Sequence, residues 1–250
     1  MPDDRVGFDS YLSRHYAHLG DQQRHRARRK RQLLRTYEHL LPPSRDAELL
    51  EIGPGYGQWL EALRVDRGYA RAVAVDVSAE VVDFCNGVMP GSTTLVSDTV
   101  EYLGRQAGHF RRIFAFHVLE HVERDRLLPL VRAIGGALEP GGEFVVEVPN
   151  MANAFTAGLL RYGDLTHETG FTELSMRQLL EAGGLSGVRC FEERLALTVP
   201  QDLLTMLFRS VARGGQWLAY RGYQLPVPAV LTPALCASAI RPQPAPESGA

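Results

Sequence analysis

A glycine-rich turn connects an apolar segment to the start of a helical pattern. It reads Glu51-Ile52-Gly53-Pro54-Gly55-Tyr56-Gly57. Glycine lets the backbone turn sharply and approach a ligand that a Cβ atom would block. The three glycines alternate, whereas the dinucleotide fingerprint places its last glycine three residues after the second. The turn predicts either a tight strand-to-helix connection or a binding site for a ligand other than a dinucleotide.

Short apolar segments and helical patterns alternate from Ala47 onward. The expected strands are Ala47–Ile52, Ala72–Val75, Thr93–Val96, Arg112–Phe116 and Gly142–Val148, and the expected helices are Gln58–Arg64, Ala79–Val88, Val100–Gln106 and Leu127–Leu138. This alternation indicates crossover units and a parallel sheet with helices on both faces. The sequence therefore predicts a Rossmann-like, doubly wound α/β fold.

The chain ends differ from this pattern. Residues 1–43 are predicted to form an N-terminal helical cap, with one helix over Phe8, Leu12 and Tyr16 and a second over about Asp21–Leu41. The main domain is expected to span residues 44–240. The tail from Arg241 to Ala250 is rich in proline and small residues, which predicts disorder.

The second N-terminal helix begins with the basic run Arg24–Arg31. Such a run usually forms a solvated helix face. The alternative is that one or two of its arginines reach an anionic ligand.

Bulk properties narrow the function classes. A net charge of −2 provides no field that would attract nucleic acid. Cys85, Cys190 and Cys236 are widely spaced and show no zinc-binding pattern, which is typical of a reducing compartment. No apolar run is long enough for a membrane helix. We expect a cytoplasmic protein, and no feature of the sequence defines an oligomeric state.

Two acidic residues follow predicted strands. Asp76 ends the segment Val73–Val75, and its carboxylate can accept from both hydroxyls of a ribose. Asp98 follows Thr94–Val96 and can accept from an adenine amino group. Each aspartate can instead cap the next helix, and for Asp98, followed by Thr99, the two roles are compatible.

Five motifs in this order resemble class I S-adenosylmethionine (SAM)-dependent methyltransferases over about residues 47–150. They are Glu-Ile-Gly-Pro-Gly-Tyr-Gly at 51–57, Val-Asp at 75–76, Ser-Asp at 97–98, Phe-His-Val-Leu-Glu-His at 116–121 and Leu-Glu-Pro-Gly-Gly at 138–142. The resemblance implies a seven-stranded sheet with a reversed final hairpin. Gly187–Leu195 and Leu235–Ile240 would form its last two strands.

The resemblance also implies a role for each matching residue. The methionine part of SAM would lie against Glu51, Gly53, Gly55 and Gly57. Asp76 would bind the ribose, Val77 would contact the adenine, and Asp98 with Thr99 would lie at the adenine edge. His117 would lie close to the sulfonium. The product of the donor would be S-adenosylhomocysteine.

Beyond Asn150 the chain resembles a bacterial branch related to ubiquinone O-methyltransferases, whose members often methylate sugars. The similarity lies in Pro149-Asn150, in Arg161-Tyr162-Gly163-Asp164-Leu165-Thr166-His167-Glu168, in Phe171-Thr172 and in Ser175-Met176-Arg177. The N-terminal segment Tyr11–Tyr16 also resembles that branch. It implies a small hydroxylated acceptor, such as a sugar or glycoside, and no nucleic acid. We expect the acceptor to be contacted by Tyr11, Tyr16, Tyr162 and His121. The alternatives are N-methylation of an amino sugar or other amine, and a non-catalytic SAM-binding regulatory module.

A hydroxyl acceptor needs a general base, and histidine suits this task near neutral pH. His167, beside Asp164, and His117 are the expected catalytic residues. His117 could instead only line the cofactor site, and His167 could only staple its loop. Asp164 and His167 could alternatively hold a divalent metal. Because the sequence has no dense carboxylate cluster, we expect no metal.

A helical insertion is predicted at about residues 200–223. Its apolar stripe is interrupted at Gly214-Gly215 and consists of Leu203, Leu204, Leu207, Phe208 and Val211. The favoured interpretation is that this stripe packs over the acceptor pocket. Alternatively it rests on a membrane surface, with Trp217, Tyr220, Tyr223 and three arginines nearby.

The helix after the loop at 162–168 has two possible N-caps, Thr172 and Ser175, and is expected to end at Gly183-Gly184.

Overall fold

The structure is a computed structural model that describes residues 22–195 and 200–244. The predictions for Phe8, Tyr11, Leu12 and Tyr16 lie outside the described residues. The strands are β1 (Leu49–Ile52), β2 (Ala72–Asp76), β3 (Thr93–Leu95), β4 (Phe110–Phe116), β5 (Leu138–Pro149), β6 (Ser186–Glu192) and β7 (Ala234–Ile240). The helices are α2 (Gln22–Tyr37), α3 (Gln58–Glu61), α4 (Ala79–Val88), α5 (Thr99–Gly104), α6 (Arg124–Ala137), α7 (Ala157–Tyr162), α8 (Glu173–Ala182) and α9 (Pro200–Gly222).

All seven strands form one sheet in the order β3-β2-β1-β4-β5-β7-β6. The first five pair in parallel, and β7 runs antiparallel to both β5 and β6. The expected seven-stranded fold with a reversed final hairpin is therefore confirmed. The strand order reverses between β1 and β4, and open α/β sheets bind ligands at the carboxyl ends of the strands at such a point.

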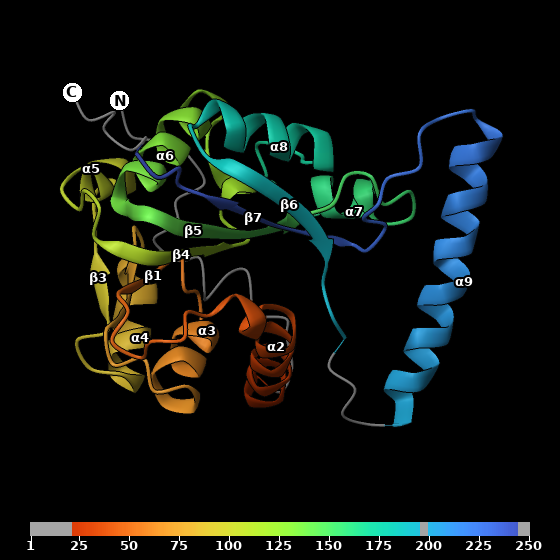
Figure 1. The fold of residues 1–250 in the computed structure, drawn as a ribbon. Coiled ribbons are helices and arrows are strands. Elements are labelled where there is room, and N and C mark those ends of the chain that lie inside the picture. Colours follow the sequence, from red (N-terminus) through yellow and green to blue (C-terminus); the bar gives the residue numbers. More distant parts are fainter. Residues whose placement is uncertain (1–21, 196–199, 245–250) are drawn as a thin grey trace, which may run out of the picture.

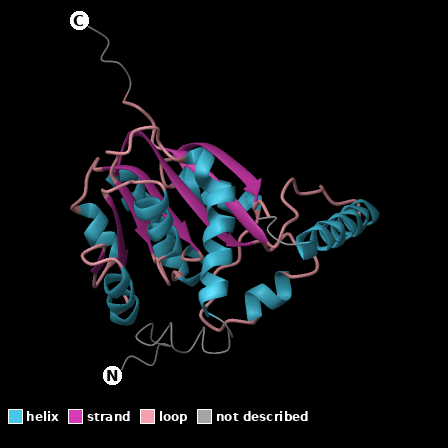
Figure 2. Ribbon diagram, turned by 90° about the horizontal axis from the view of Figure 1, so that it is seen from below, coloured by secondary structure: helices cyan, strands magenta, loops and turns pink. Residues whose placement is uncertain are grey.

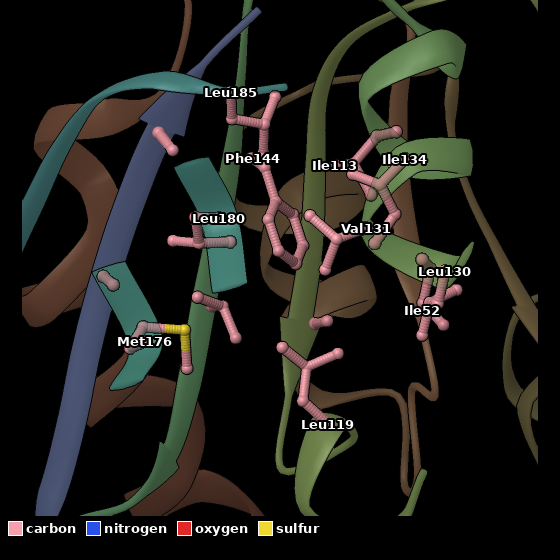
Figure 3. Packing of buried hydrophobic residues seen from close by; sticks show 14 of the residues in the cluster. Ile52, Ile113, Leu119, Leu130, Val131, Ile134, Phe144, Met176, Leu180 and Leu185 are labelled. Atoms are coloured by element: carbon pink, nitrogen blue, oxygen red, sulfur yellow. The ribbon is translucent and has the colours of Figure 1, made fainter. Parts of the chain in front are cut away.

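Helices cover both faces of the sheet, with α2, α3 and α4 on one side and α5, α6 and α8 on the other (Figures 1 and 2). On the second side, Val131 and Ile134 of α6 and Leu180 of α8 pack around Phe144 of β5 (Figure 3). All four side chains are buried. Burying such side chains is the main favourable contribution to folding, about 2 kcal/mol each.

The N-terminal helix belongs to the core on the first side. Leu33 and Tyr37 of α2 are buried against Trp59 and Phe116. The rings of Tyr37 and Phe116 are 4.7 Å apart. The described part of the predicted N-terminal cap is thus packed directly on the sheet.

Several local boundaries differ from the expectations. The helix expected over Gln58–Arg64 becomes a π-helix from Ala62. Helix α7 lies directly before the loop at 162–168, where no helix was predicted. The Asn153 side chain explains this, because its oxygen accepts from the backbone N–H groups of Phe155 and Thr156 and so orders the turn that leads into the helix.

The start of α8 selects between its two possible caps. Thr172 is the N-cap, and its hydroxyl accepts from the backbone N–H of Ser175. The Ser175 hydroxyl in return accepts from the N–H of Thr172. At the other end of the domain, Arg241 pairs with the backbone of Gly141 and Gly142. The first residue of the expected disordered tail is therefore bound to the fold.

Helix α9 stands beside the sheet (Figure 1) and agrees with the helix expected at about residues 200–223. It continues through Gly214 and Gly215, where its apolar stripe is interrupted. Its polar side faces the body, where Arg213 contacts Glu192 and Tyr220 donates to the carbonyl of Ala152.

The apolar side of α9 is exposed, as Leu207 at 58% and Phe208 at 63% illustrate. None of the described α9 residues lines the main cavity. The expected packing of the stripe over the acceptor pocket is therefore wrong. Within the described ranges, no helix is both long and apolar enough to cross a membrane.

Candidate functional site

A cavity of about 1030 Å³ opens at the carboxyl ends of β1, β2 and β4. The predicted residues Glu51, Gly53, Gly55, Asp76, Val77, Asp98, Thr99, His117 and His121 all line it. They come from four separate loops, which the parallel sheet brings to one edge. Its volume slightly exceeds the usual range for a single small-molecule ligand.

The glycine-rich turn forms one wall. Gly53, Gly55 and Gly57 have φ angles of +68°, +53° and +67°, a region that other residues adopt only with strain. A Cβ on Gly53 would lie 2.6 Å from the Val118 side chain, whereas a Cβ on Gly55 would meet no atom within 4 Å. Gly57 does not line the cavity; it precedes α3, where a Cβ would lie 3.2 Å from Cys85 Sγ.

Glu51 is buried at the base of this turn. Its Oε2 receives no hydrogen bond from any described residue. Burial raises the pKa of its carboxyl group well above the ordinary value. A buried polar atom without a partner is costly and often marks a ligand position. The ammonium group of SAM would satisfy Glu51, and the open space beside Gly55 would accept the methionine chain, so these residues fit the cofactor.

Asp76 lies at the end of β2. Its Oδ1 accepts from the backbone N–H of Ser78 at 2.8 Å. Burial raises the pKa of the Asp76 carboxyl group to about 6. Val77 beside it is 44% exposed and lines the cavity. This placement fits the predicted ribose and adenine contacts.

Asp98 is the N-cap of α5, where Oδ1 accepts from the N–H groups of Val100 and Glu101. Its second oxygen pairs with Arg126. The hydrogen bond from Glu101, together with the Arg126 ion pair, lowers the pKa of the Asp98 carboxyl group. Asp98 therefore performs the capping role while it also lines the cavity, and Thr99 lines the cavity next to it.

His117 follows β4 with a φ of +56°, which is unusual for a residue other than glycine. Its Nδ1 lies 3.0 Å from Glu120 Oε1 and its Nε2 lies 2.9 Å from Glu147 Oε1. Burial alone would lower its pKa, but these two carboxylates raise it above the ordinary value. A cationic imidazole that donates from both nitrogens has no lone pair for a substrate proton. The geometry therefore favours the cofactor-wall role for His117.

Glu147 is the centre of this network and was missed in the sequence. It is buried at 1% exposure and accepts from Arg29, Tyr37 and His117. These donors lower the pKa of its carboxyl group although burial opposes the change. A glutamate between the apolar residues Phe-Val-Val and Val-Pro of this strand was the available signal, because a buried acid requires partners.

The basic run of α2 is not simply a solvated helix face, because several of its side chains pair with carboxylates of the body. Arg29 is bound to Glu147, and Lys30 bonds Glu61 at 2.7 Å. His25, Arg29 and Gln32 line the cavity. Helix α2 therefore closes one side of the site while most of its charges are neutralised by the body.

The other predicted residues lie at the opposite rim. His121 Nδ1 lies 2.8 Å from Thr166 Oγ1, which donates to Asp164 Oδ1 at 2.7 Å. His167 Nδ1 lies 2.6 Å from the carbonyl of Leu160. The rings of His121 and His167 are 4.7 Å apart. The structure thus brings together His121, Asp164 and His167, which come from two loops.

Not all of these residues face the cavity. His121 lines it, with Leu165, Thr166 and Glu168, whereas Asp164 and His167 lie just behind this wall. Tyr162 is 78% exposed and is outside the lining, with Arg161 over its ring. The expected acceptor contact of Tyr162 therefore has no support in this arrangement.

Known structures resemble this fold closely. A SAM-dependent methyltransferase from Archaeoglobus fulgidus aligns over 93% of this chain and 100% of its own, with a TM-score of 0.65 and 21% identity. Phosphoethanolamine N-methyltransferase 2 from Haemonchus contortus, solved with SAM, aligns over 97% of this chain and 62% of its own, with a TM-score of 0.61 and 17% identity. A possible histamine N-methyltransferase from Thermotoga maritima aligns over 93% of this chain and 99% of its own, with a TM-score of 0.59 and 11% identity.

The fold and the cavity together define a class I SAM-dependent methyltransferase. A family described as a methyltransferase domain matches residues 23–189, and the chain belongs to this family. A search of curated proteins found no match. The cofactor prediction is confirmed, since the matched family and the similar structures are SAM-dependent methyltransferases. SAM supplies an electrophilic methyl group on a sulfonium, and the residues described above would bind and orient it.

Proposed function

We propose that this methyltransferase acts on a hydroxyl group of a small polar acceptor, with a sugar or glycoside as the preferred class. The observation that supports this most is the rim formed by His121, Thr166 and Glu168. It continues the cavity beyond the residues that would bind SAM. Its side chains are polar and suit the hydroxyl groups of a sugar.

The histidine pair supports an oxygen acceptor. Burial lowers the pKa of His121, so its imidazole is neutral at neutral pH. Because Thr166 gives its only hydroxyl proton to Asp164, it must accept from His121 Nδ1, which leaves the lone pair on Nε2. A neutral imidazole with this tautomer can accept a hydrogen bond from a hydroxyl group. Methyl transfer then depends mainly on holding that oxygen in line with the methyl carbon.

Methylation of an amine is the second candidate. Similar folds include a phosphoethanolamine N-methyltransferase and a possible histamine N-methyltransferase. At pH 7 an aliphatic amine must lose a proton before it attacks, so a neutral imidazole would suit this acceptor too.

An acceptor screen by mass spectrometry tests the proposal. The full chain is incubated with SAM and with nucleotide sugars, glycosides or amino sugars, and products heavier by one methylene are sought. Fragmentation that places the methyl group on oxygen supports the proposal, and placement on nitrogen supports the alternative. Tight SAM binding with no product from any acceptor would favour a non-catalytic SAM-binding module.

We also propose where the enzyme acts in the cell. The unpaired thiols of Cys85, Cys190 and Cys236 suit a cytoplasmic enzyme.

The exposed apolar side of α9 suits contact with a membrane surface that holds a lipid-linked acceptor, with Trp217 and Arg221 at its end. Sedimentation with anionic lipid vesicles tests this contact. Phe208→Glu should abolish it, whereas Val65→Glu, a change of an exposed valine elsewhere, should not.

A further inference from the structure

Glu120, His121 and His167 form a compact cluster at the rim of the cavity. One potential ligand atom from each lies within 4.8 Å of the other two. Glu120 and His121 belong to the short 3-10 helix after β4, and His167 belongs to the loop after α7. The three residues are thus brought together by the fold and not by sequence spacing.

Hydrogen bonds fix which ring nitrogen of each histidine carries a proton and which can coordinate a metal ion. The Leu160 carbonyl can only accept, so His167 Nδ1 bears a proton and the ring can coordinate only through Nε2, which lies 4.0 Å from Asp164 Oδ2. The Thr166–Asp164 pair sets the same tautomer in His121. Metal-binding histidines typically donate their second ring nitrogen to a carbonyl or carboxylate in this way.

The carboxylate of Glu120 also has an oxygen that could bind a metal ion. Glu120 is 1% exposed, and its Oε1 lies 3.0 Å from His117 Nδ1. No described residue donates a hydrogen bond to its Oε2. A buried carboxylate oxygen without a partner is costly. A cation placed between Glu120 and the two histidines would remove this cost.

The backbone holds the two loops together. The carbonyl of Glu120 accepts from the N–H groups of Glu168 and Thr169, at 2.7 and 3.2 Å. Arg161 of α7 donates to the carbonyl oxygens of His167 and Glu168. The loop that bears His167 is therefore fixed to the segment that bears Glu120 and His121 without any ion.

We propose that Glu120, His121 and His167 bind one divalent first-row transition metal ion at the acceptor end of the cavity. Two imidazoles and one carboxylate suit zinc, manganese, iron or cobalt better than magnesium, which prefers oxygen ligands. Three protein ligands leave positions for water or an acceptor oxygen. This replaces the sequence-based expectation of no metal and the alternative of Asp164 as a ligand.

The ion would bind the acceptor hydroxyl in place of the histidine nitrogens and lower the pKa of that hydroxyl. Binding of the ion does not depend on the proposed function, whereas this role toward an acceptor oxygen rests on it. The two are tested separately, first by metal titration without any acceptor and then by methyl transfer.

Metal binding is measured on the untagged full chain after treatment with a chelator. Zinc and manganese are titrated by calorimetry, and cobalt by its visible absorption, which reports the ligand set. We expect one ion per chain with micromolar or tighter affinity. His167→Ala should weaken binding by about a hundredfold or more, whereas His109→Ala, which changes a histidine outside the cavity, should not.

The His167→Ala variant retains the buried Glu120 and the half-buried His121, so a loss of binding would not arise from a disrupted core. Circular dichroism and SAM affinity check that this variant is folded. The proposal would be overturned if none of the three ions bound with a submillimolar dissociation constant. It would also be overturned if wild type and His167→Ala bound the ion with equal affinity. If the ion binds as expected but the chelated enzyme transfers methyl groups at the full rate, the site is structural and the acceptor role is overturned.

Discussion

The guanidinium group of Arg29 lies 2.6 Å from the carboxylate of Glu147, 118 residues further along the chain. Arg29 belongs to helix α2 and Glu147 to strand β5. Tyr37 and His117 donate to the same carboxylate. This contact joins the helix that closes one side of the cavity to a strand of the sheet, so α2 is tied to the body of the domain.

Removing Arg29 should therefore destabilise the whole domain. Arg29→Ala leaves the buried Glu147 without its main counter-charge, and breaking a buried pair in this way costs about 3–5 kcal/mol. Urea unfolding followed by circular dichroism measures the change. Arg31→Ala, on the exposed side of the same helix, should change the free energy of unfolding by about 0.5 kcal/mol or less. Equal stability of the two variants would show that the ion pair does not form in solution.

Asp76 should contribute strongly to SAM affinity. Asp76→Ala removes the carboxylate that would accept from the ribose hydroxyls, and we expect at least tenfold weaker binding, about 1.4 kcal/mol or more. Isothermal calorimetry gives the comparison. Asp83→Ala, which alters an exposed residue of α4, serves as the control and should bind SAM normally. Unchanged affinity of Asp76→Ala would remove this residue from the ribose role.

The raised pKa of Asp76 predicts that the stability of the protein without SAM depends on pH. Burial raises the pKa of Asp76 from 3.8 to about 6, so the folded state binds a proton in a range where the unfolded state has lost it. This contribution is stabilising below pH 4 and is lost as the pH rises through 6. Asparagine does not ionise, so Asp76→Asn avoids this loss of folding free energy, which is at most about 3 kcal/mol.

Thermal unfolding without ligand measures this effect at pH 5 and pH 7. Asp76→Asn should melt at a higher temperature than the wild type at pH 7, and the difference should shrink at pH 5. The order should reverse at saturating SAM, because only the wild type keeps the ribose contact. A difference between the two proteins that does not vary with pH would contradict a raised pKa for Asp76.

The two glycines of the turn should respond differently to alanine. Gly53→Ala places a Cβ atom 2.6 Å from Val118, so the folded state should be strongly destabilised. Gly55→Ala meets no atom, and its cost is the strain of a positive φ, about 1 kcal/mol. Its methyl group should instead weaken SAM binding. Normal SAM affinity in Gly55→Ala would show that the open space is not the methionine site.

His167 should act on the acceptor side. His167→Ala should leave SAM affinity nearly unchanged and lower turnover, because His167 lies behind the rim opposite the glycine-rich turn. Binding calorimetry and single-turnover rates separate the two effects. Loss of SAM affinity with normal turnover of the bound complex would assign His167 to the cofactor site.

The donor half of the site was predictable because its signals are local. Glu51 lies in the last half of β1, Asp76 is the last residue of β2, and Asp98 follows the end of β3 by three residues. The parallel sheet brings these strand ends to one edge. Helix α9 shows where this reasoning fails. Its apolar stripe predicted burial, but the polar side faces the body, because Glu192 and Glu193 attract Arg213 and Arg209. Periodicity identifies the faces of a helix but not the one that the body binds.

The amino-acid sequence determined the fold class, the succession of strands and helices along the chain and the candidate SAM-binding residues, because these depend on short-range patterns and on fixed rules of chain connection. Only the tertiary structure decided which side chains lie next to the buried glutamates. Glu147 meets Arg29 across 118 residues, and Glu120 meets His167 across 47. Such pairs form when separate elements dock, and no spacing in the sequence encodes them. The opposite rim, where we place the metal and the acceptor, combines such long-range contacts with local ones such as the hydrogen bond between Thr166 and Asp164.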